Sequence, residues 1–269
     1  MNGTVYLVGA GPGAPDLLTL RAARLLGRAE IVFHDALVPQ AILSLASKAR
    51  KIEVGKRSGR HSTAQNFINK RLADAARKHQ VVVRLKGGDP MLFGRAHEEI
   101  AYLKEKRIRV EVIPGVTAAL AASADLAVSL TRRGLSRSVV FVTPRTGLGE
   151  RPNQWVKVVL AADTAGIYMG AGQAKEISQA LIGAGKSPAT PLVVVENASL
   201  PEGRRFYGLL GQLEQTAARS AGGPVLILLG EVYREAAASQ IIASWSNERS
   251  SSSPTARAIR TGRARSSSS

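Results

Sequence analysis

Residues 81–95 read VVVRLKGGDPMLFGR and carry the clearest signal for the fold. The apolar run at the start, interrupted only by Arg84, predicts a short buried strand of the parallel-sheet type. Gly87 and Gly88 let the chain turn sharply and approach a ligand with no Cβ in the way, and Pro90 ends the strand before a new helix. Ligands bind beyond the carboxyl ends of parallel strands, so the loop predicts a binding site. An ordinary strand-to-helix turn is the alternative.

The same alternation of strands and helices extends over most of the chain and predicts an α/β fold. Strands are expected in the first half at residues 4–8, 31–33, 51–54, 81–85 and 110–113, with helices at 17–26, 41–49, 63–78 and 95–106. Strands are expected in the second half at residues 139–143, 165–168, 192–195, 206–210 and 225–229, with a helix at 174–183 and another between the last two strands. The second half has fewer helices and is therefore expected to be partly antiparallel.

We therefore expect two α/β domains, with a mainly parallel sheet in residues 1–114 and a mixed sheet in residues 115–245. Residues 246–269 form a Ser/Arg-rich tail with almost no large apolar side chains. This tail is expected to be disordered because it cannot bury enough apolar surface.

The composition excludes several classes of site and of location. The chain has no cysteine, which rules out disulfides, thiol nucleophiles and cysteine-ligated metals. Its four histidines show no metal-binding spacing, so no metal site is expected. The N-terminus does not resemble a signal peptide, and residues 110–130, the most apolar long region, are broken by Glu111, Pro114 and Asp125. We expect no membrane span and a cytoplasmic location.

The formal net charge of +17 favours anionic partners such as nucleic acid, a membrane surface or an acidic small molecule. The alternative is a solvated basic surface. Residues 246–269 contribute only five arginines and one glutamate, so most of the excess charge lies in the rest of the chain.

A second glycine loop, GAGPGA at residues 9–14, matches the pattern GxGxxA after a strand. With Asp35 at the end of the next strand, it is compatible with a dinucleotide site. Pro12 and Pro15 argue against that interpretation, because proline removes backbone donors that a pyrophosphate needs. The 26 residues from Gly9 to Asp35 are also somewhat long for the dinucleotide pattern.

Several long motifs, in order, make the chain resemble the tetrapyrrole methylase family, which uses S-adenosylmethionine. The motifs are YLVGAGPGAPDLLTL (6–20), HDALV (34–38), VGKRSGRH (54–61), VVVRLKGGDPMLFGRAHEE (81–99), VIPGVTAALAASA (112–124), SLTRRG (129–134), YMG (168–170) and VVVENAS (193–199). The resemblance covers about residues 3–243 and is far more specific than a lone GxGxxG. No dehydrogenase or chelatase domain precedes Gly3, so we expect a methylase rather than a fused multifunctional enzyme.

The resemblance implies a homodimer of two-domain chains with the active-site cleft between the domains. It implies that the cofactor-binding site is lined by Pro12, Gly87, Gly88, Asp89, Leu92, Thr117, Ala118, Met169 and Ala198. A carboxylate suits the ribose or amino group of this cofactor, although Asp89 could instead cap a helix. Met169 could instead be core filler. Proline-bearing loops tolerate a sulfonium ligand better than a pyrophosphate.

The activity implied by the resemblance is methylation of uroporphyrinogen III at two pyrrole carbons, giving precorrin-2 via precorrin-1 in sirohaem or cobalamin synthesis. The implied catalytic residues are Asp35 as proton acceptor, Lys56 as proton donor, and Arg95. The alternative for Asp35 is a cap on a helix beginning near Leu37. The expected substrate-binding residues are Arg95, Glu98, Arg132 and Arg133, with Lys56 and Arg145 as further candidates. Guanidinium groups bind carboxylates bidentately, which suits an eight-carboxylate macrocycle.

Other functions remain open from the sequence. The nearest is another member of the same family, acting on a later corrin intermediate or on ribosomal RNA. A nicotinamide-dependent dehydrogenase would use the GAGPGA loop. A nucleic-acid-binding protein would explain the charge, although five Tyr, five Phe and two Trp leave few stacking platforms. We expect no nucleic-acid or membrane partner.

Overall fold

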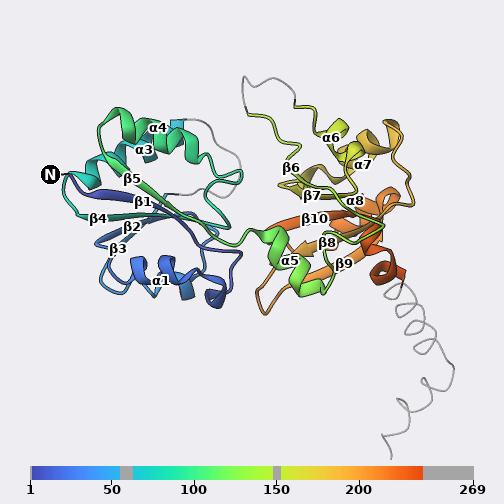
Figure 1. Ribbon diagram of the computed structural model, residues 1–269, viewed down its shortest axis with the longest axis horizontal. Helices are drawn as coiled ribbons and strands as arrows, with labels where there is room; N and C mark the ends of the chain where they lie inside the picture. Colours follow the sequence, from blue (N-terminus) through green and yellow to red (C-terminus); the bar gives the residue numbers. More distant parts are fainter. Residues whose placement is uncertain (1, 55–62, 148–152, 239–269) are drawn as a thin grey trace, which may run out of the picture. The chain divides into compact units, whose positions relative to one another are not determined.

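The computed structural model describes residues 2–54, 63–147 and 153–238, which form two compact units (Figure 1). The first unit lies within Met1–Ala127 and also takes in Val195–Arg204 and Gly222–Leu226. The second unit holds the other described residues. The domain boundaries predicted after residues 114 and 245 stay predictions, and the predicted tail lies outside the described residues.

The first unit is built on a five-stranded sheet in which every neighbouring pair is parallel. The strands are β1 (Thr4–Gly9), β2 (Ile31–His34), β3 (Arg50–Glu53), β4 (Val81–Lys86) and β5 (Arg109–Ile113), in the order β3-β2-β4-β1-β5. Parallel strands end at the same edge of a sheet. The loops that follow β1, β2, β4 and β5 therefore come together at that edge.

Helices cover both faces of this sheet, with α3 and α4 on one face and α1 on the other (Figure 1). The helices of the first half are α1 (Leu20–Leu26), α2 (Gln40–Leu43), α3 (Thr63–Ala76), α4 (Ala96–Glu105) and α5 (Ala118–Leu126). Val83 and Leu85 of β4 pack into a core with side chains of α1 and α2, whereas Val82 packs with α3 and α4. Side chains alternate along a strand, so Arg84 and Lys86 lie on the α3/α4 face.

The second sheet also has five strands, in the order β6-β7-β10-β8-β9. They are β6 (Val139–Val142), β7 (Thr164–Tyr168), β8 (Pro191–Glu196), β9 (Arg204–Leu209) and β10 (Val225–Gly230). The β6 and β7 strands are parallel. The neighbouring strands β8 and β9 are joined by residues 197–203, too few for a parallel crossover, so this pair is antiparallel. The prediction of two α/β sheets, the first parallel and the second mixed, is confirmed.

Three helices accompany the second sheet: α6 (Trp155–Ala161), α7 (Ala174–Gly183) and α8 (Leu213–Ala217). The α7 helix has the predicted bounds. No helix was predicted at α6, because its sequence WVKVVLA is rich in valine, which favours strands. Across residues 2–54, 63–147 and 153–238, no helix has both the length and the apolar character needed to cross a membrane.

Candidate active site

Three glycine-containing loops pack backbone to backbone at the carboxyl edge of the first sheet. Gly11 and Gly88 exchange two hydrogen bonds, with N···O distances of 3.2 and 2.7 Å. A Cβ on Gly9 would lie 2.6 Å from Gly115 Cα and 2.7 Å from the Gly88 carbonyl oxygen. The loops after β1, β4 and β5 can therefore approach this closely only because glycine occupies these positions.

Asp89 ties the loop after β4 to the loop after β5. Its carboxylate accepts the backbone N–H of Met91 at 2.8 Å and the backbone N–H of Gly115 at 2.9 Å. The first bond closes the local turn around Pro90. Asp89 does not cap a helix, because α4 begins at Ala96 with Arg95 before it. The second bond fixes the approach to Thr117, the residue before α5.

A fourth segment, residues 197–199 after β8, joins the same group of loops. The Ser199 hydroxyl accepts the Ala14 N–H at 3.1 Å, and the Ser199 N–H donates to an Asp125 carboxylate oxygen at 2.7 Å. Ala198, between Asn197 and Ser199, is buried. The loop after β1 is thus linked to a segment far along the chain.

All but one of the residues predicted to bind the cofactor lie in the first unit, on these connected loops or, for Ala118, at the first position of α5. They are Pro12, Gly87, Gly88, Asp89, Leu92, Thr117, Ala118 and Ala198. The exception is Met169, which follows β7 in the second unit and has a left-handed backbone, with φ of 56°. Contact of these residues with a cofactor stays a prediction.

Gly87 differs from its glycine neighbours because a side chain would fit there. No described atom would lie within 4 Å of a Cβ on Gly87, whereas a Cβ on Gly115 would lie 2.3 Å from the Gly88 carbonyl oxygen. Packing of the described residues therefore does not require glycine at position 87. An open face beside the turn leaves room for a small molecule to approach the backbone.

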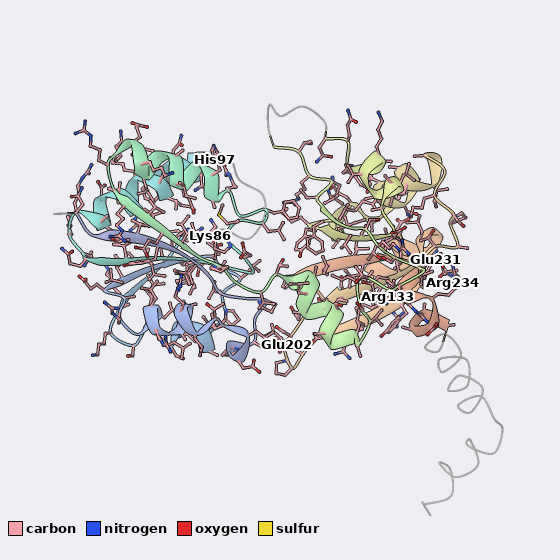
Figure 2. The ribbon with its side chains drawn as sticks, in the orientation of Figure 1. Lys86, His97, Arg133, Glu202, Glu231 and Arg234 are labelled. Atoms are coloured by element: carbon pink, nitrogen blue, oxygen red, sulfur yellow. The ribbon has the colours of Figure 1, made fainter. Side chains whose placement is uncertain are left out.

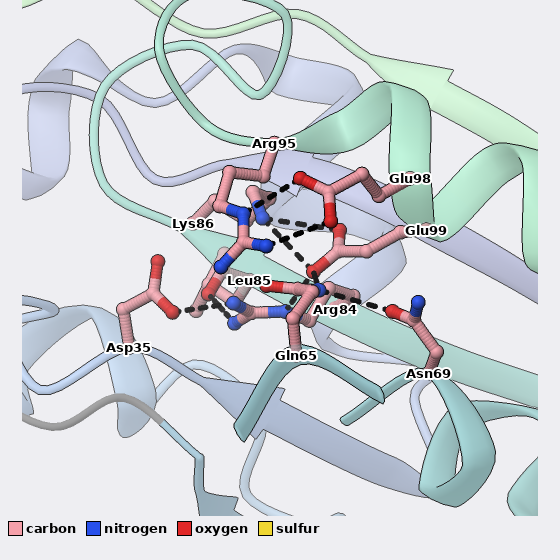
Figure 3. Close-up of polar contacts among 9 residues, drawn as sticks. All are labelled: Asp35, Gln65, Asn69, Arg84, Leu85, Lys86, Arg95, Glu98 and Glu99. Atoms are coloured by element: carbon pink, nitrogen blue, oxygen red, sulfur yellow. Dashed lines mark hydrogen bonds and ion pairs between the residues drawn. The ribbon is translucent and has the colours of Figure 1, made fainter. Parts of the chain in front are cut away.

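A cluster of buried charges lies under these loops, on the α3/α4 face of the sheet (Figure 3). The Glu99 carboxylate of α4 accepts the Arg84 Nε–H at 3.1 Å and accepts from Lys86 Nζ through both oxygens at 3.0 Å. Gln65 of α3 donates to Glu99 at 3.2 Å and to Asn69 at 3.0 Å. The Glu99 side chain is 0% exposed, so all of these bonds lie away from solvent.

Burial and neighbouring charges act in opposite directions on the two cations of this cluster. Burial lowers the pKa of Arg84, but the carboxylates of Asp35 and Glu99 outweigh it and raise that pKa above its usual value. Burial, with the nearby Arg84 charge, lowers the pKa of Lys86 despite its bonds to Glu99. Arg84 is therefore held firmly in its charged form.

Asp35, the predicted proton acceptor, lies at the end of β2 beside this cluster. Its carboxylate accepts an N–H of Arg84 at 2.5 Å, and its side chain is 30% exposed. The Asp35 backbone N–H donates to the Leu85 carbonyl at 3.2 Å. Asp35 does not cap α2, because that helix begins at Gln40 and has no side-chain cap. Lys56, the predicted proton donor, lies outside the described residues.

Arg95 and Glu98, both predicted to bind substrate, bind each other in the structure. Arg95 donates through Nε and Nη2 to the two Glu98 oxygens, both at 2.7 Å, and both side chains are about half exposed. The hydrogen bond from Arg95 holds the pKa of Glu98 below its usual value. Arg95 itself has a left-handed backbone, with φ of 55°, at the start of α4. Backbone strain of this kind is often found at functional sites.

The remaining predicted substrate residues lie in the second unit. Arg132 pairs with Glu235 at 2.9 Å on an exposed surface, and Arg133 (labelled in Figure 2) is also exposed. Arg145 is exposed as well. Their role in substrate binding stays a prediction.

Sequence reasoning missed three residues that organise this region: Arg84, Glu99 and Ser199. A partial signal for the charge cluster was present in the sequence. Arg84 and Lys86 lie on one face of a buried strand, and buried charged side chains need partners of opposite charge. Nothing local in the sequence indicates that Ser199 would meet Ala14, which lies 185 positions away.

The sequence profile described as Tetrapyrrole (Corrin/Porphyrin) Methylases matches residues 4–214. A uroporphyrinogen-III C-methyltransferase of Pseudomonas aeruginosa is 43% identical over 236 residues, which cover 87% of this chain and 96% of that protein. A siroheme synthase of Zymomonas mobilis is 43% identical over 232 residues, covering 86% of this chain. The match covers 49% of that synthase, so the chain spans about half the length of this relative.

Solved structures show the same likeness. The uroporphyrin-III C-methyl transferase of Thermus thermophilus, complexed with S-adenosylhomocysteine, matches with a TM-score of 0.76 and 40% identity. That match covers 86% of this chain and 99% of the solved chain. A cobalt precorrin-4 methyltransferase matches with a TM-score of 0.74 and 27% identity, covering 85% of this chain and 95% of the other.

Proposed function

The chain belongs to the tetrapyrrole (corrin/porphyrin) methylases, and from that membership we propose that it methylates carbon atoms of uroporphyrinogen III with S-adenosylmethionine as donor. The observation that carries the proposal is the 43% identity over 96% of a uroporphyrinogen-III C-methyltransferase. The proposed product is precorrin-2, formed via precorrin-1 by methylation of two pyrrole carbons. The product would enter sirohaem or cobalamin synthesis, and a cytoplasmic homodimer is part of the proposal.

The loops at the carboxyl edge of the first sheet fit such a cofactor. Gly87 has an open face where an adenosine or methionine group could approach the backbone. Pro12 and Pro15 leave that loop with few N–H donors, which suits a cation better than a phosphate. The same features weigh against a nicotinamide dinucleotide. When bound, S-adenosylmethionine supplies an electrophilic methyl group.

In this proposal the protein contributes orientation and proton transfer. Formation of the new carbon–carbon bond leaves the pyrrole ring with a proton to lose, and Asp35 accepts it. Its side chain is partly exposed, so it can meet a substrate, while Arg84 fixes its position. Holding the reacting carbon in line with the methyl group supplies most of the rate, because proximity and alignment can lower a barrier by ~7–11 kcal/mol. Lys56 is the proposed proton donor.

Cationic side chains give the proposed selectivity for a polycarboxylate. Arg95, Arg132 and Arg133 are the proposed carboxylate clamps, and Arg95 already binds a carboxylate, that of Glu98, in the bidentate geometry required. A substrate carboxylate would exchange with Glu98 for this guanidinium.

The test is to incubate the purified protein with uroporphyrinogen III and S-adenosylmethionine. We expect S-adenosylhomocysteine to form together with products carrying first one and then two added methyl groups by mass spectrometry. If the acceptor gains no methyl group while the protein binds S-adenosylhomocysteine, the acceptor is wrong and the cofactor is right.

A later corrin intermediate is the second candidate acceptor. The likeness to a cobalt precorrin-4 methyltransferase, at 27% identity, favours it because the fold is shared at nearly the same TM-score. Offering both acceptors to the same preparation separates the two, since only the true one is methylated at low enzyme concentration.

A further inference from the structure

The Glu99 carboxylate has no part in the proposed chemistry, yet it is the centre of the buried charge cluster (Figure 3). It accepts from Arg84, Lys86 and Gln65 at 3.0–3.2 Å, and its side chain is 0% exposed. These partners come from β4 and α3, while Glu99 belongs to α4. A buried carboxylate between two cations is costly to build and needs all of its partners.

Arg84 is the link between this centre and the surface. Its guanidinium is directed at three acceptors: Nε–H at Glu99 (3.1 Å), Nη1–H at the Leu85 carbonyl (3.2 Å) and Nη2–H at Asp35 (2.5 Å). The planar fork of arginine cannot rotate without breaking at least one of these bonds. The position of the Asp35 carboxylate is therefore set by the orientation of Arg84.

Glu99 in turn determines that orientation. Without the Glu99 charge, Asp35 would be the one anion left on the Arg84 side chain among the described residues. Lys86 would then lie near Arg84 without the carboxylate that both now bind. Like charges repel strongly when they are buried. The guanidinium would then move toward Asp35 and solvent, and the carboxylate would move with it.

We propose that Glu99 is a positioning residue for the reaction, which holds Arg84 and through it fixes the Asp35 carboxylate for proton transfer. This inference rests on the proposed function, in which Asp35 is the proton acceptor. The competing explanation is that the cluster only joins α4 to the sheet, or only supports the glycine loop that follows Lys86. The two explanations make different predictions for turnover and for cofactor affinity.

The first experiment compares Glu99→Gln with Glu105→Gln. Glu105 lies on the same helix and also pairs with a lysine, Lys106 at 2.7 Å, but this pair is exposed. We expect Glu99→Gln to lower kcat at least tenfold with an unchanged Kd for S-adenosylhomocysteine, and Glu105→Gln to match the wild type. A loss confined to S-adenosylhomocysteine affinity, with kcat intact, would assign the cluster to the glycine loop and overturn the proposal.

A double-mutant cycle supplies the decisive readout. If Glu99 acts through Asp35, then Asp35→Asn together with Glu99→Gln is no slower than Asp35→Asn alone, because the group being positioned is already gone. If the two losses multiply, Glu99 acts independently and the inference fails. If Asp35→Asn keeps wild-type turnover, the proposed role of Asp35 fails first, and the inference fails with it.

A second variant covers the case in which Glu99→Gln does not fold. Combining Glu99→Gln with Lys86→Met removes one buried charge of each sign and leaves Arg84 paired with Asp35. We expect this protein to fold, shown by a cooperative unfolding transition, and to have a kcat below that of the wild type, because Arg84 has still lost the carboxylate that accepts its Nε–H. Wild-type turnover in this folded variant would refute the positioning role.

Discussion

Replacement of Gly87 by alanine tests whether glycine at this position is needed for ligand binding and not for folding. The added methyl group would meet no described atom within 4 Å, and the backbone at Gly87 is outside the left-handed region. Within the described part of the protein, then, nothing resists an alanine at this position. A large loss of ligand affinity at unchanged stability would therefore indicate contact of this face with a bound molecule.

The expected magnitudes follow from this geometry. The free energy of unfolding should change by no more than about 0.5 kcal/mol, as for an unhindered surface substitution. If the cofactor passes over Gly87 in van der Waals contact, the methyl group overpacks that contact at a cost of about 1–3 kcal/mol. We expect the Kd for S-adenosylhomocysteine to rise at least tenfold, which corresponds to about 1.4 kcal/mol.

Calorimetric titration with S-adenosylhomocysteine, together with urea unfolding, measures both quantities. Gly183→Ala is the matched control, because a Cβ there also meets nothing within 4 Å, and its affinity should equal that of the wild type. Gly115→Ala is the opposite control. Its Cβ would lie 2.3 Å from the Gly88 carbonyl oxygen, so it should lower stability. Unchanged affinity in a stable Gly87→Ala protein would refute the idea that a cofactor approaches this face.

Substitutions at Asp89, Arg132, Arg133 and Asp163 test other parts of the protein. Asp89→Ala should lower both stability and S-adenosylhomocysteine affinity by about 1–3 kcal/mol, because its carboxylate accepts two backbone N–H groups, and unchanged values in both titrations would contradict this. Arg133→Ala should lower methylation at least tenfold, about 1.4 kcal/mol, at constant cofactor affinity. Arg133→Lys should rescue it only partly, Arg132→Ala should be milder, and undiminished turnover would remove Arg133 from the site. Hydrogen bonds, led by the backbone N–H of Arg137, hold the pKa of Asp163 below its usual value, so the ionised form stabilises the fold above about pH 4 and that stability is lost as the pH falls further. Asp163→Asn should therefore lose less stability than the wild type between pH 5 and pH 3 in urea unfolding, and equal losses would refute this.

Hydrophobic periodicity and turn residues in the sequence predicted most of the strands, turns and helices. The strand and double glycine of residues 81–95 occur as β4 and the loop after it, and the helix expected at 95–106 occurs as α4, since each has its own periodicity or turn residue. The parallel order of the strands brings their loops to one edge. For that reason the residues of the first unit that are predicted to bind the cofactor lie close together at this edge. The sequence alone does not reveal which hydrogen bonds connect their loops.

Contacts between distant residues were not predictable in the same way. Arg84 appeared only as an interruption of an apolar run, and its partners Asp35 and Glu99 come from two other elements. The Arg95–Glu98 pair lies within three positions, yet nothing in the local pattern indicates the left-handed backbone of Arg95 or the two bonds it makes. Helical and strand periodicity carry no information on such long-range pairing or local backbone strain.

The bond between Ala14 and Ser199 has a consequence for how the protein is made. It joins residues 185 positions apart inside one compact unit, and that unit also needs Gly222–Leu226. Contacts of such long sequence separation form late, because the loop between them must close first. A chain emerging from a ribosome could pair β1 with β4 early, but the loop bearing Pro12 would gain its bond to Ser199 only after the chain had grown past that residue. A nascent protein stalled before Ser199 would lack this bond, so its loop after β1 would be held at this edge only by the contacts with the loops after β4 and β5.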